Sequence, residues 1–420
     1  MRVLFINTTD IQGGAAVVVQ RLRKSLHRDF AIEDRLVVKI KTSDDENTHQ
    51  ILSSIGQTYA EKAIDKLTKT AGLLYQSFPF SSRRILEEVR DFRPDIIHLH
   101  NTHGSFFPTP LIRTLSRHAP LVWTLHDMWS FTGNSAHTFG NMSWKHMRND
   151  KALTKISPTI WINAGAWLLR QKRSVYRDSN ITVVCPSGWL QDLVLQSPVF
   201  EGKQVLRIYN GLDTNIFAPR NKRAARSKLG LDPHAKTVMF SARFLGSIWK
   251  GGADLESILR HIDRLDSEKI NFLAVGEGRL DDPTPFRNLE VHYKNFVLGE
   301  ENMADCYNAS DVFIYPTRAD NLPNSLIESI ACGVPAVTFD IGGNKEIIEH
   351  DLNGIILAPF DLEAFAAHTL ELLRNDGKRA AFSQQGRDLA CHKFDMYTMA
   401  RQYFDLYKSI VLTSTAVNKI

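Results

Sequence analysis

Features that define several special classes of protein are missing from this sequence. The cysteines, Cys185, Cys306, Cys332 and Cys391, are scattered and form no Cys-x-x-Cys pair, so neither a disulfide framework nor a structural zinc site is indicated. No apolar run approaches the roughly 18 residues that would indicate a membrane-spanning helix. The opening MRVLFINTTD is too short in apolar length for a signal peptide and predicts a strand instead. These absences fit a protein of the reducing cytoplasm.

The chain also lacks a large excess of either positive or negative charge. The formal net charge of +5 is too small to indicate a nucleic acid partner. The first glycine loop lacks the Gly-x-Gly-x-x-Gly dinucleotide fingerprint, which disfavours a nicotinamide dehydrogenase.

The overall composition is ordinary for a globular protein, with 43% hydrophobic and 23% charged residues. At 420 residues the chain is long enough for two domains, each with its own core.

The chain begins with a predicted strand, a glycine loop and a helix. Val3–Ile6 is an apolar run typical of a parallel strand, and Gly13 and Gly14 open a helix that continues to about Leu26. Glycines let the backbone approach a phosphate closely, and a helix N-terminus attracts its charge. We expect a phosphate or sugar contact at Gly13 and Gly14; alternatively, the two glycines only turn the chain. Further on, 41–57 is polar and predicts a loop.

Two later strands are predicted to end in histidines. Pro94–His100 and Leu121–Asp127 are largely apolar, and His126 stands at the carboxyl end of the second, near Trp129. Ligands bind at this edge of open α/β sheets, so His126 either contacts a ligand or is a structural histidine hydrogen-bonded beneath a loop. The other histidines are expected to be structural, hydrogen-bonded beneath a loop: His98, His100 and His103.

The segment from Trp144 to Arg177 is basic and aromatic, with Asp150 as its one acidic residue. Such a composition suits a surface that rests on anionic lipid or binds a lipid-phosphate acceptor. The alternative is a solvated helix face over ordinary core aromatics. The residues concerned are Lys145, Arg148, Lys151, Lys155, Arg170, Lys172, Arg173 and Arg177, with Trp144, Trp161, Trp167, Leu168 and Leu169.

The second half contains a pair of spaced cations. Asn-Gly at 210–211 is a strong turn signal and places a linker near 210–220. A predicted strand, Thr237–Ala242, then leads to Arg243, and Lys250 follows just before two glycines and a helix. Arginine offers a bidentate fork to phosphate oxygens and lysine a compact charge, so together they predict a cationic pocket. Singly, either residue is better explained as a surface cation.

The stretch 313–337, FIYPTRADNLPNSLIESIACGVPAV, organises the rest of the chain. Phe313–Pro316 predicts a buried strand, and after a polar loop Ser325–Cys332 predicts a short helix with Gly333 as its C-cap. A ligand beyond the strand and facing the helix N-terminus meets free N–H groups and the positive end of the helix dipole. This arrangement suits an oxygen-rich or anionic ligand.

Asp320 and Glu328 bracket that ligand position. A purely structural interpretation is that Ser325 and Glu328 form a capping box and that Asp320 is a solvated acidic residue of the loop. The whole string, however, resembles the core motif of retaining glycosyltransferases of family 4, which have the GT-B fold. That motif is an acidic residue, seven intervening residues, a glutamate and a sequence such as Ala-Cys-Gly-Val-Pro-Ala-Val. The family usually has Glu where this chain has Asp320, so the charge is kept and the reach is one methylene shorter.

The resemblance extends over nearly the whole chain. It implies an α/β protein with two Rossmann-like, doubly wound domains facing across a cleft. The expected domains are an acceptor-side domain over 1–209, a nucleotide-sugar-binding domain over 210–395, and a final helix over 396–420 that crosses back to the first. Bacterial exopolysaccharide and colanic-acid-type enzymes are the members it resembles. The matching segments are Gly13-Gly14, DIIHLH at 95–100, TLHDMW at 124–129, NGLD at 210–213, Arg243 with Lys250-Gly251, Gly276-Glu277-Gly278 and Gly342-Gly343.

The resemblance also implies roles for individual residues. Arg243, Lys250 and the Gly13-Gly14 loop would hold the diphosphate of a nucleotide-sugar, and Glu328 would contact its ribose. Asp320 would hold sugar hydroxyls, and His126 would orient the sugar. Further contacts to the donor are expected at Asn321, Leu322, Ser325 and Gly276, and at Val297 within 296–299, where relatives place the base against backbone groups.

The implied reaction is a retaining hexose transfer that uses no cofactor beyond its nucleotide-sugar substrate. No Asp-x-Asp occurs in the chain, which removes the carboxylate pair that usually holds a divalent ion on the donor, so we expect metal independence. The expected acceptor is a saccharide, lipid-linked and used in surface polysaccharide or lipopolysaccharide assembly, with peripheral contact to the inner face of the membrane. Alternatives are a nucleotide-sugar epimerase of the same fold and a non-catalytic saccharide-binding relative.

Overall fold

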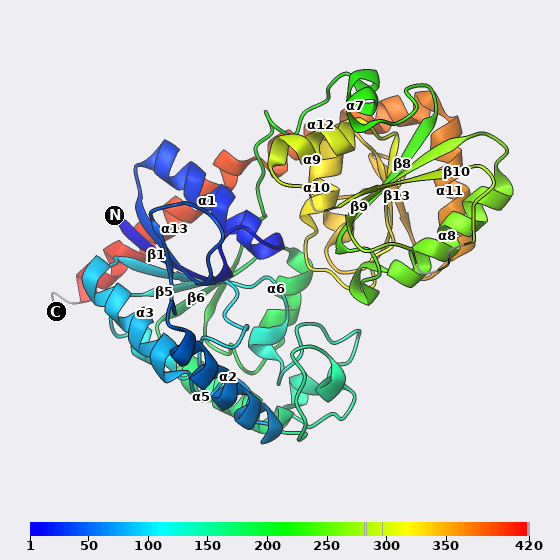
Figure 1. The fold of residues 1–420 in the computed structure, drawn as a ribbon. Coiled ribbons are helices and arrows are strands. Elements are labelled where there is room, and N and C mark those ends of the chain that lie inside the picture. The colour runs from blue at the N-terminus through cyan, green and yellow to red at the C-terminus, as the bar shows by residue number, and fades with distance from the viewer. Residues whose placement is uncertain (281, 283, 296, 418–420) are drawn as a thin grey trace. The chain divides into compact units, whose positions relative to one another are not determined.

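The computed structural model describes residues 1–280, 282, 284–295 and 297–417. The chain divides into two compact units (Figure 1). Unit 1 comprises Met1–Gly211 and the chain from Tyr397 onward, and unit 2 comprises Leu212–Met396. The first boundary therefore falls beside the Asn-Gly turn at 210–211.

Unit 1 is built on a seven-stranded sheet of order β3-β2-β1-β4-β5-β6-β7. β1 pairs in parallel with β2 and with β4, so that Val3 stands opposite both Asp34 and Ile96. All residues of β4, β5 and β6 are buried, because helices cover both faces of a parallel sheet. The strands are β1 (Arg2–Thr9), β2 (Glu33–Ile40), β3 (Thr48–Gln50), β4 (Ile96–Leu99), β5 (Leu121–Thr124), β6 (Ile181–Cys185) and β7 (Gln204–Arg207).

The helices of unit 1 are α1 (Gly14–Phe30), α2 (Ile55–Thr70), α3 (Pro79–Phe92), α4 (Leu111–Leu115), α5 (Gly165–Arg177) and α6 (Gly188–Leu195), with the 3-10 turns η1 (Trp129–Phe131), η2 (Ser143–His146) and η3 (Leu153–Lys155). The loop predicted over 41–57 was partly wrong, since it contains β3 and the start of α2. β3 is only three residues long, too short for a periodic apolar signal.

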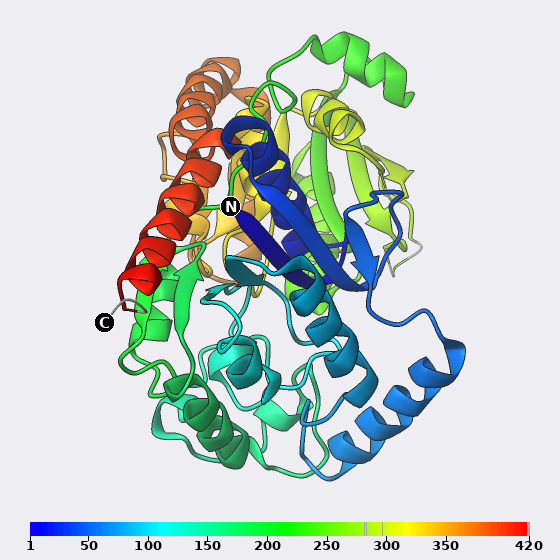
Figure 2. The same cartoon turned by 90° about the vertical axis from the view of Figure 1, so that its left-hand side faces the viewer.

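The last helix, α13 (Met396–Val417), packs on unit 1 (Figures 1 and 2). Near its start Tyr397 stacks on Phe30 of α1 with the ring centroids 5.6 Å apart. Deeper in the unit, the Tyr403 hydroxyl lies 2.7 Å from Thr124 Oγ1 and the Tyr407 hydroxyl 2.7 Å from His98 Nδ1. Buried hydrogen bonds thus attach the C-terminal helix to β4 and β5.

Unit 2 is built on a six-stranded sheet of order β10-β9-β8-β11-β12-β13, in which neighbouring strands pair in parallel. The strands are β8 (Lys236–Phe244), β9 (Ile270–Glu277), β10 (Leu289–Lys294), β11 (Val312–Tyr315), β12 (Ala336–Phe339) and β13 (Gly354–Leu357). The helices are α7 (Lys222–Leu229), α8 (Gly252–Leu265), α9 (Glu300–Asn308), α10 (Asn324–Ala331), α11 (Leu362–Arg374) and α12 (Asp376–Lys393), with η4 (Ile248–Lys250) and η5 (Asn344–Glu346).

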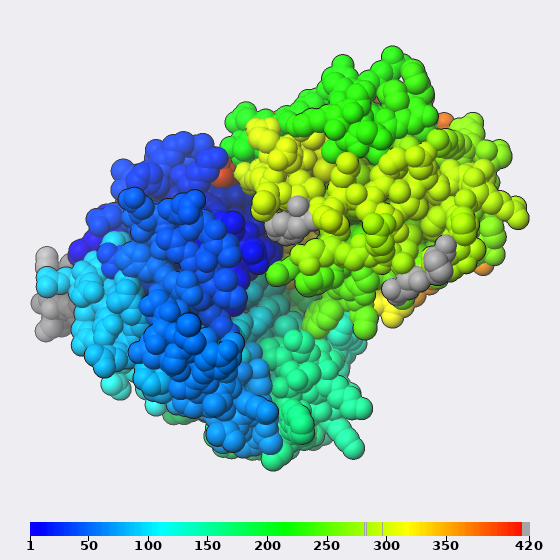
Figure 3. Space-filling view, viewed as in Figure 1, coloured from blue at the N-terminus to red at the C-terminus, as the bar shows by residue number. Residues whose placement is uncertain are grey.

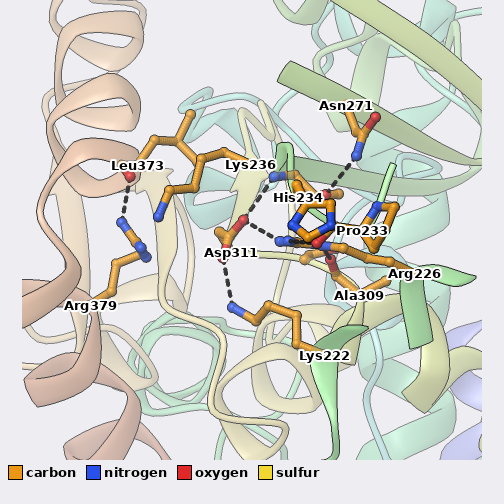
Figure 4. A network of polar contacts seen from close by, with 12 residues as sticks. Lys222, Arg226, Pro233, His234, Lys236, Asn271, Ala309, Asp311, Leu373 and Arg379 are labelled. Carbon is orange, nitrogen blue, oxygen red and sulfur yellow. Dashed lines mark hydrogen bonds and ion pairs between the residues drawn. The ribbon is translucent and has the colours of Figure 1, made fainter. Parts of the chain in front are cut away.

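The amino end of β11 carries a buried carboxylate that anchors α7 (Figure 4). Asp311 accepts hydrogen bonds from Lys222 Nζ at 2.7 Å, from Arg226 Nη2 at 2.5 Å and from the Thr237 N–H at 2.8 Å. Burial alone would raise the pKa of Asp311, but the two cations and the hydrogen bonds outweigh it and lower the pKa. This network lies at the edge of the sheet opposite the strand ends discussed next, so its role is structural.

Both sheets have the strand order of a doubly wound α/β fold, as predicted. In each of them the order reverses once, between β1 and β4 in unit 1 and between β8 and β11 in unit 2. Ligands of such sheets bind beyond the carboxyl ends of the strands at this reversal, which is where the predicted site residues stand.

Candidate active site

In unit 2 the reversal brings together two residues that are far apart in the sequence. Lys250 follows β8 and Asp320 follows β11, and Lys250 Nζ forms an ion pair with Asp320 Oδ2. Lys250 Nζ also donates to the hydroxyl of Tyr315 at 2.7 Å, and that hydroxyl donates to the same carboxylate oxygen. We call these three side chains the Lys250 cluster. Lys250 and Asp320 were predicted site residues, whereas Tyr315 was not, because a tyrosine at the end of an apolar strand gives no signal of its own.

The loop that carries Lys250 is held against the chain just beyond β11. Its anchor is the carbonyl oxygen of Trp249, which accepts hydrogen bonds from Thr317 Oγ1 at 2.9 Å, Arg318 N at 3.0 Å and Ala319 N at 3.2 Å. Gly251 has a φ of 75°, and a Cβ there would stand 1.9 Å from the carbonyl oxygen of Pro316. Only glycine permits this close approach, so Gly251 sets the position of Lys250.

The charges of the Lys250 cluster stabilise each other. Burial would raise the pKa of Asp320, but the Lys250 ammonium and the hydrogen bonds from Lys250, Tyr315 and the Asn321 N–H hold the pKa below its ordinary value. Burial would lower the pKa of Lys250, yet the Asp320 carboxylate and Tyr315 raise it. At neutral pH the cluster therefore contains an ammonium and a carboxylate. Their side chains remain 32% and 16% exposed, so a ligand can reach them.

The loop after β12 supports Asp320 from another side. The N–H of Gly343 donates to the carbonyl oxygen of Asn321 at 2.8 Å. Gly342 has a φ of 60°, and a Cβ there would stand 2.0 Å from the carbonyl oxygen of Asp320. The Asn321 N–H donates to Asp320 Oδ1 at 2.9 Å. Both backbone groups of Asn321, where a contact to the donor was expected, are thus engaged within the loop in this structure, and Leu322 beside it is buried.

Glu328 lies inside α10 and is only 8% exposed. The helix begins at Asn324, one residue earlier than predicted, and ends at Ala331, with no side-chain hydrogen bond at its N-cap. The capping box considered for Ser325 and Glu328 is therefore wrong. Instead, the hydroxyl of Tyr307, from α9, donates to Glu328 Oε2 at 3.1 Å. A glutamate held by a buried tyrosine on a neighbouring helix has a fixed orientation that a capping glutamate would not have.

The other predicted donor contacts of unit 2 stand near the ends of β8, β9 and β10. Arg243 is exposed near the end of β8, and its guanidinium carbon lies 5.3 Å from the ring centre of Phe244. Gly276 lies where a Cβ would stand 1.8 Å from the carbonyl oxygen of Ala242, so it keeps β9 close to this end of β8. Val297 is half-buried. Its neighbour Phe296 lies outside the described residues.

In unit 1 the glycine loop follows β1 and is fixed by a buried acid that the sequence did not single out. Asp10 accepts hydrogen bonds from Ile11 N at 2.9 Å, Thr42 N at 2.8 Å, Thr42 Oγ1 at 2.9 Å and Ser43 N at 2.7 Å. Burial would raise its pKa, but these hydrogen bonds lower it. Gly13, with a φ of 90°, is exposed, and α1 has no acidic residue in its first turn that would repel an anion.

His126 follows β5 and contacts a second histidine. Its Nε2 lies 3.0 Å from Nδ1 of His100, which follows β4. Burial lowers the pKa of His126 to about 4 and that of His100 well below the ordinary value, so both rings are neutral at pH 7. One ring must then donate to the other. His98 is buried and bonds to Thr124 and Tyr407, as expected of a structural histidine, and His100 is buried as well.

His103 pairs with a carboxylate at the same edge. His103 Nε2 lies 2.6 Å from Asp127 Oδ2, and the Trp129 N–H donates to Asp127 Oδ1 at 2.8 Å. A cavity here has about 10 Å³ of free space, room for roughly one water molecule. It is lined by four residues whose buried polar atoms lack a partner among the described residues: His100 Nε2, Thr102 Oγ1, Trp129 Nε1 and Ser130 Oγ.

The basic and aromatic segment divides between core and surface. Lys172 was expected at a surface but is buried, and its Nζ donates to the carbonyl oxygens of Trp129 and Thr132 at 2.5 and 3.0 Å. It therefore fixes the loop after His126. Trp144, Leu168 and Leu169 also belong to the core. Trp161 and Trp167, by contrast, are exposed.

Comparison with known proteins identifies the family. A family model described as Glycosyltransferase Family 4 matches residues 12–216, and one described as Glycosyl transferases group 1 matches 235–375. Together the two models span most of the chain, so it belongs to the glycosyltransferases that combine these two domains. Among curated relatives of this glycosyltransferase, the D-inositol 3-phosphate glycosyltransferase of Xylanimonas cellulosilytica is 26% identical over 243 residues, which are 51% of this chain and 56% of the relative.

A relative from Escherichia coli is named UDP-Gal:alpha-D-GlcNAc-diphosphoundecaprenol alpha-1,3-galactosyltransferase. It is 22% identical to this glycosyltransferase over 240 residues, which are 55% of this chain and 60% of the relative. The match thus spans less than two thirds of either relative's length. Among solved structures, Anabaena HepE in complex with UDP-glucose superposes with a TM-score of 0.65 at 16% identity, covering 97% of this chain and 100% of HepE. This similarity shows the GT-B fold.

Proposed function

We propose that this glycosyltransferase moves a hexose from a nucleotide-sugar to a saccharide acceptor, with retention of anomeric configuration and without a metal ion. The observation that carries the proposal is the Lys250 cluster at the strand reversal of unit 2, where an accessible ammonium stands beside a carboxylate. An ammonium suits a diphosphate, and a carboxylate suits sugar hydroxyls. The UDP-glucose bound to HepE supports the same class of donor.

In this proposal the protein supplies fixed charges to a leaving diphosphate. Lys250 and Arg243 neutralise the negative charge that grows on the diphosphate as the sugar bond breaks, which is commonly the largest catalytic contribution. Asp320 orients the sugar through its hydroxyls, and Glu328 binds the ribose. The neutral imidazole of His126 hydrogen-bonds to the sugar, while the Gly13-Gly14 loop and the start of α1 add backbone N–H groups to the phosphates.

We propose that the same cations make a metal ion unnecessary. The sequence contains no Asp-x-Asp. Among the residues that the structure describes, no group of three or more His, Cys, Asp or Glu side chains is arranged to hold a metal ion. Two fixed cations at the donor site provide the charge that a divalent ion would otherwise supply.

The transfer is tested by incubating the protein with UDP-, GDP- and ADP-hexoses and measuring release of the nucleoside diphosphate, with and without EDTA. We expect turnover with a saccharide acceptor that EDTA leaves intact. Turnover that EDTA abolishes and magnesium restores would contradict metal independence. A changed sugar that appears without any acceptor would identify an epimerase, and binding of saccharide without turnover would identify a non-catalytic relative.

We also propose that the acceptor is lipid-linked and that unit 1 contacts an anionic membrane peripherally. The name of the undecaprenol-linked relative supports such an acceptor. No helix among the described residues is long and apolar enough to cross a bilayer, so the proposed contact is made by a surface. We define this basic–apolar surface as the outer face of α2 together with three exposed residues that follow in the chain, Trp161, Ile162 and Trp167.

The helix α2 lies at the surface of unit 1 (Figure 3), and the residues of its outer face are those of an interfacial helix. Five of its exposed positions recur at helical spacing and are apolar or basic: Ile55, Tyr59, Lys62, Lys66 and Leu67. Both acids of the helix point inward instead, since Glu61 accepts hydrogen bonds from Ser81 and Asp65 pairs with Lys69. The end of the helix adjoins Ile162, because a Cβ on Gly72 would stand 2.9 Å from the Ile162 carbonyl oxygen.

Vesicle sedimentation tests this surface. We expect binding to phosphatidylglycerol vesicles, little binding to phosphatidylcholine vesicles, and weakening by salt, because the attraction is partly electrostatic. Trp161→Ser and Leu67→Ser should reduce binding. Leu412→Ser is a matched control, since Leu412 on α13 is 68% exposed and Leu67 is 71% exposed. Equal loss in the control, or equal binding to both lipids, would contradict the proposed surface.

A further inference from the structure

Lys250, the cation assigned above to the diphosphate, already has partners within the protein. Its Nζ pairs with Asp320 Oδ2 and lies 2.7 Å from the Tyr315 hydroxyl, which donates to the same oxygen. Asp320 Oδ2 thus accepts from two donors, while Oδ1 accepts from the Asn321 N–H. An arriving diphosphate meets an ammonium whose charge is balanced by a carboxylate in direct contact.

The ion pair between Lys250 and Asp320 is positioned by the backbone of the loops that carry the two residues. Lys250 is placed by the close approach of Gly251 to Pro316, and Asp320 by the close approach of Gly342 to its own carbonyl oxygen. Tyr315 is the last residue of β11 and is 1% exposed, so its ring cannot move away. Each member of the Lys250 cluster is therefore held by a different part of the sheet edge.

We propose that donor binding exchanges partners within the Lys250 cluster. Lys250 passes from Asp320 to the diphosphate, and Asp320 takes hydroxyl groups of the sugar in place of Lys250. Tyr315 is a positioning residue, because its hydroxyl bonds to both charged groups and keeps them next to each other for the exchange. This inference rests on the proposed function and goes beyond it in stating what Asp320 does when no sugar is bound.

The exchange makes the site discriminate between donor and product. An intact nucleotide-sugar offers Asp320 new hydrogen-bond partners when Lys250 leaves. A nucleoside diphosphate without its sugar offers none, and a largely buried carboxylate that loses its cation is unfavourable. Asp320 therefore competes with the product for Lys250 and weakens product binding. A site in which Asp320 only touched the sugar would show no such competition.

The test is calorimetric titration of Asp320→Asn, which keeps the shape of the side chain and removes its charge. We expect whichever of UDP, GDP and ADP the wild-type protein binds to bind the variant about tenfold more tightly, within the range typical of coupled sites. The matching nucleotide-sugar should gain less than about threefold, because it also loses its contact with Asp320. Transfer activity should fall in the same variant.

Tyr315→Phe separates a positioning role from a general structural one. Because the hydroxyl acts through Asp320, this variant should bind the nucleoside diphosphate with an affinity between those of the wild type and Asp320→Asn. The double variant should bind no more tightly than Asp320→Asn alone. A merely damaged site would lose affinity in each case, so a gain is not a result that misfolding produces.

Asp254→Asn is the matched control. Asp254 lies in the first turn of α8 and accepts two hydrogen bonds from Arg318, each at 2.6 Å, so the control removes a nearby negative charge outside the Lys250 cluster. Its affinity for the nucleoside diphosphate should stay within about twofold of wild type. An equal gain in this control, or no gain in Asp320→Asn, would overturn the exchange and leave the proposed function intact. Failure of the wild-type protein to bind any nucleotide or nucleotide-sugar would overturn both.

Discussion

Replacing Gly251 by alanine would push the loop that carries Lys250 away from the end of β11. The added Cβ would stand 1.9 Å from the carbonyl oxygen of Pro316, whereas real contacts of this kind are at least 3.0 Å. The loop must therefore move by about 1.1 Å, the difference between 3.0 and 1.9. The residue also has a φ of 75°, in the left-handed region that alanine adopts at a cost.

The magnitude can be built from two contributions. A left-handed alanine costs about 1–2 kcal/mol. The shift strains the three hydrogen bonds to the Trp249 carbonyl oxygen, each worth roughly 0.5–1.5 kcal/mol when intact. We expect the free energy of unfolding to fall by about 2–4 kcal/mol. A displacement of Lys250 by about 1 Å should in addition lower turnover by roughly 100-fold.

Urea unfolding and nucleoside diphosphate release measure the two effects, and the chain offers two matched controls. Gly230 has a φ of 69° but no atom within 4 Å of an added Cβ, so Gly230→Ala isolates the conformational cost. Gly246 has neither feature, so Gly246→Ala should change nothing. If Gly251→Ala were no less stable than Gly230→Ala and kept full turnover, the contact with Pro316 would not be what positions Lys250.

Three further predictions concern the free energy of unfolding. Asp311→Asn leaves Lys222 and Arg226 without their carboxylate and should lower the free energy of unfolding by about 3 kcal/mol at pH 7. The pKa of Asp311 is lowered in the folded protein, so the stability difference between wild type and variant should shrink as the pH falls below about 4, the pKa of an unfolded aspartate. Urea titrations at several pH values measure this difference. A difference that stays constant would contradict the lowered pKa of Asp311. His126 has a pKa of about 4 in the folded protein, so at pH 5 its ring is largely unprotonated there but protonated in the unfolded chain. The free energy of unfolding should therefore fall as the pH is lowered from about 7 to 5, and it should fall less steeply in His126→Gln. Ser325→Ala should change the free energy of unfolding by less than about 0.5 kcal/mol, since α10 has no side-chain cap; a larger loss would restore the capping box.

Where the sequence-based predictions were right, a local pattern was sufficient. The apolar runs at 3–6 and 313–316 predicted the strands β1 and β11, because strands covered on both faces are continuously apolar. Where they were wrong, a distant partner decided. Glu328 has the spacing of a capping box but bonds to Tyr307 on another helix, and Lys172 has the charge of a surface residue but bonds to buried carbonyl groups.

By itself, the sequence indicated the strands that lead to the site residues, the family resemblance, and the kinds of side chain that stand at the carboxyl ends of the strands. Only the tertiary structure decided that Lys250 pairs with Asp320, 70 residues further along, and that Tyr315 joins them. The physical reason is that such contacts depend on which strands are neighbours. β11 lies beside β8 although two strands separate them in the chain, and hydrophobic periodicity specifies the face of a strand but not its neighbour.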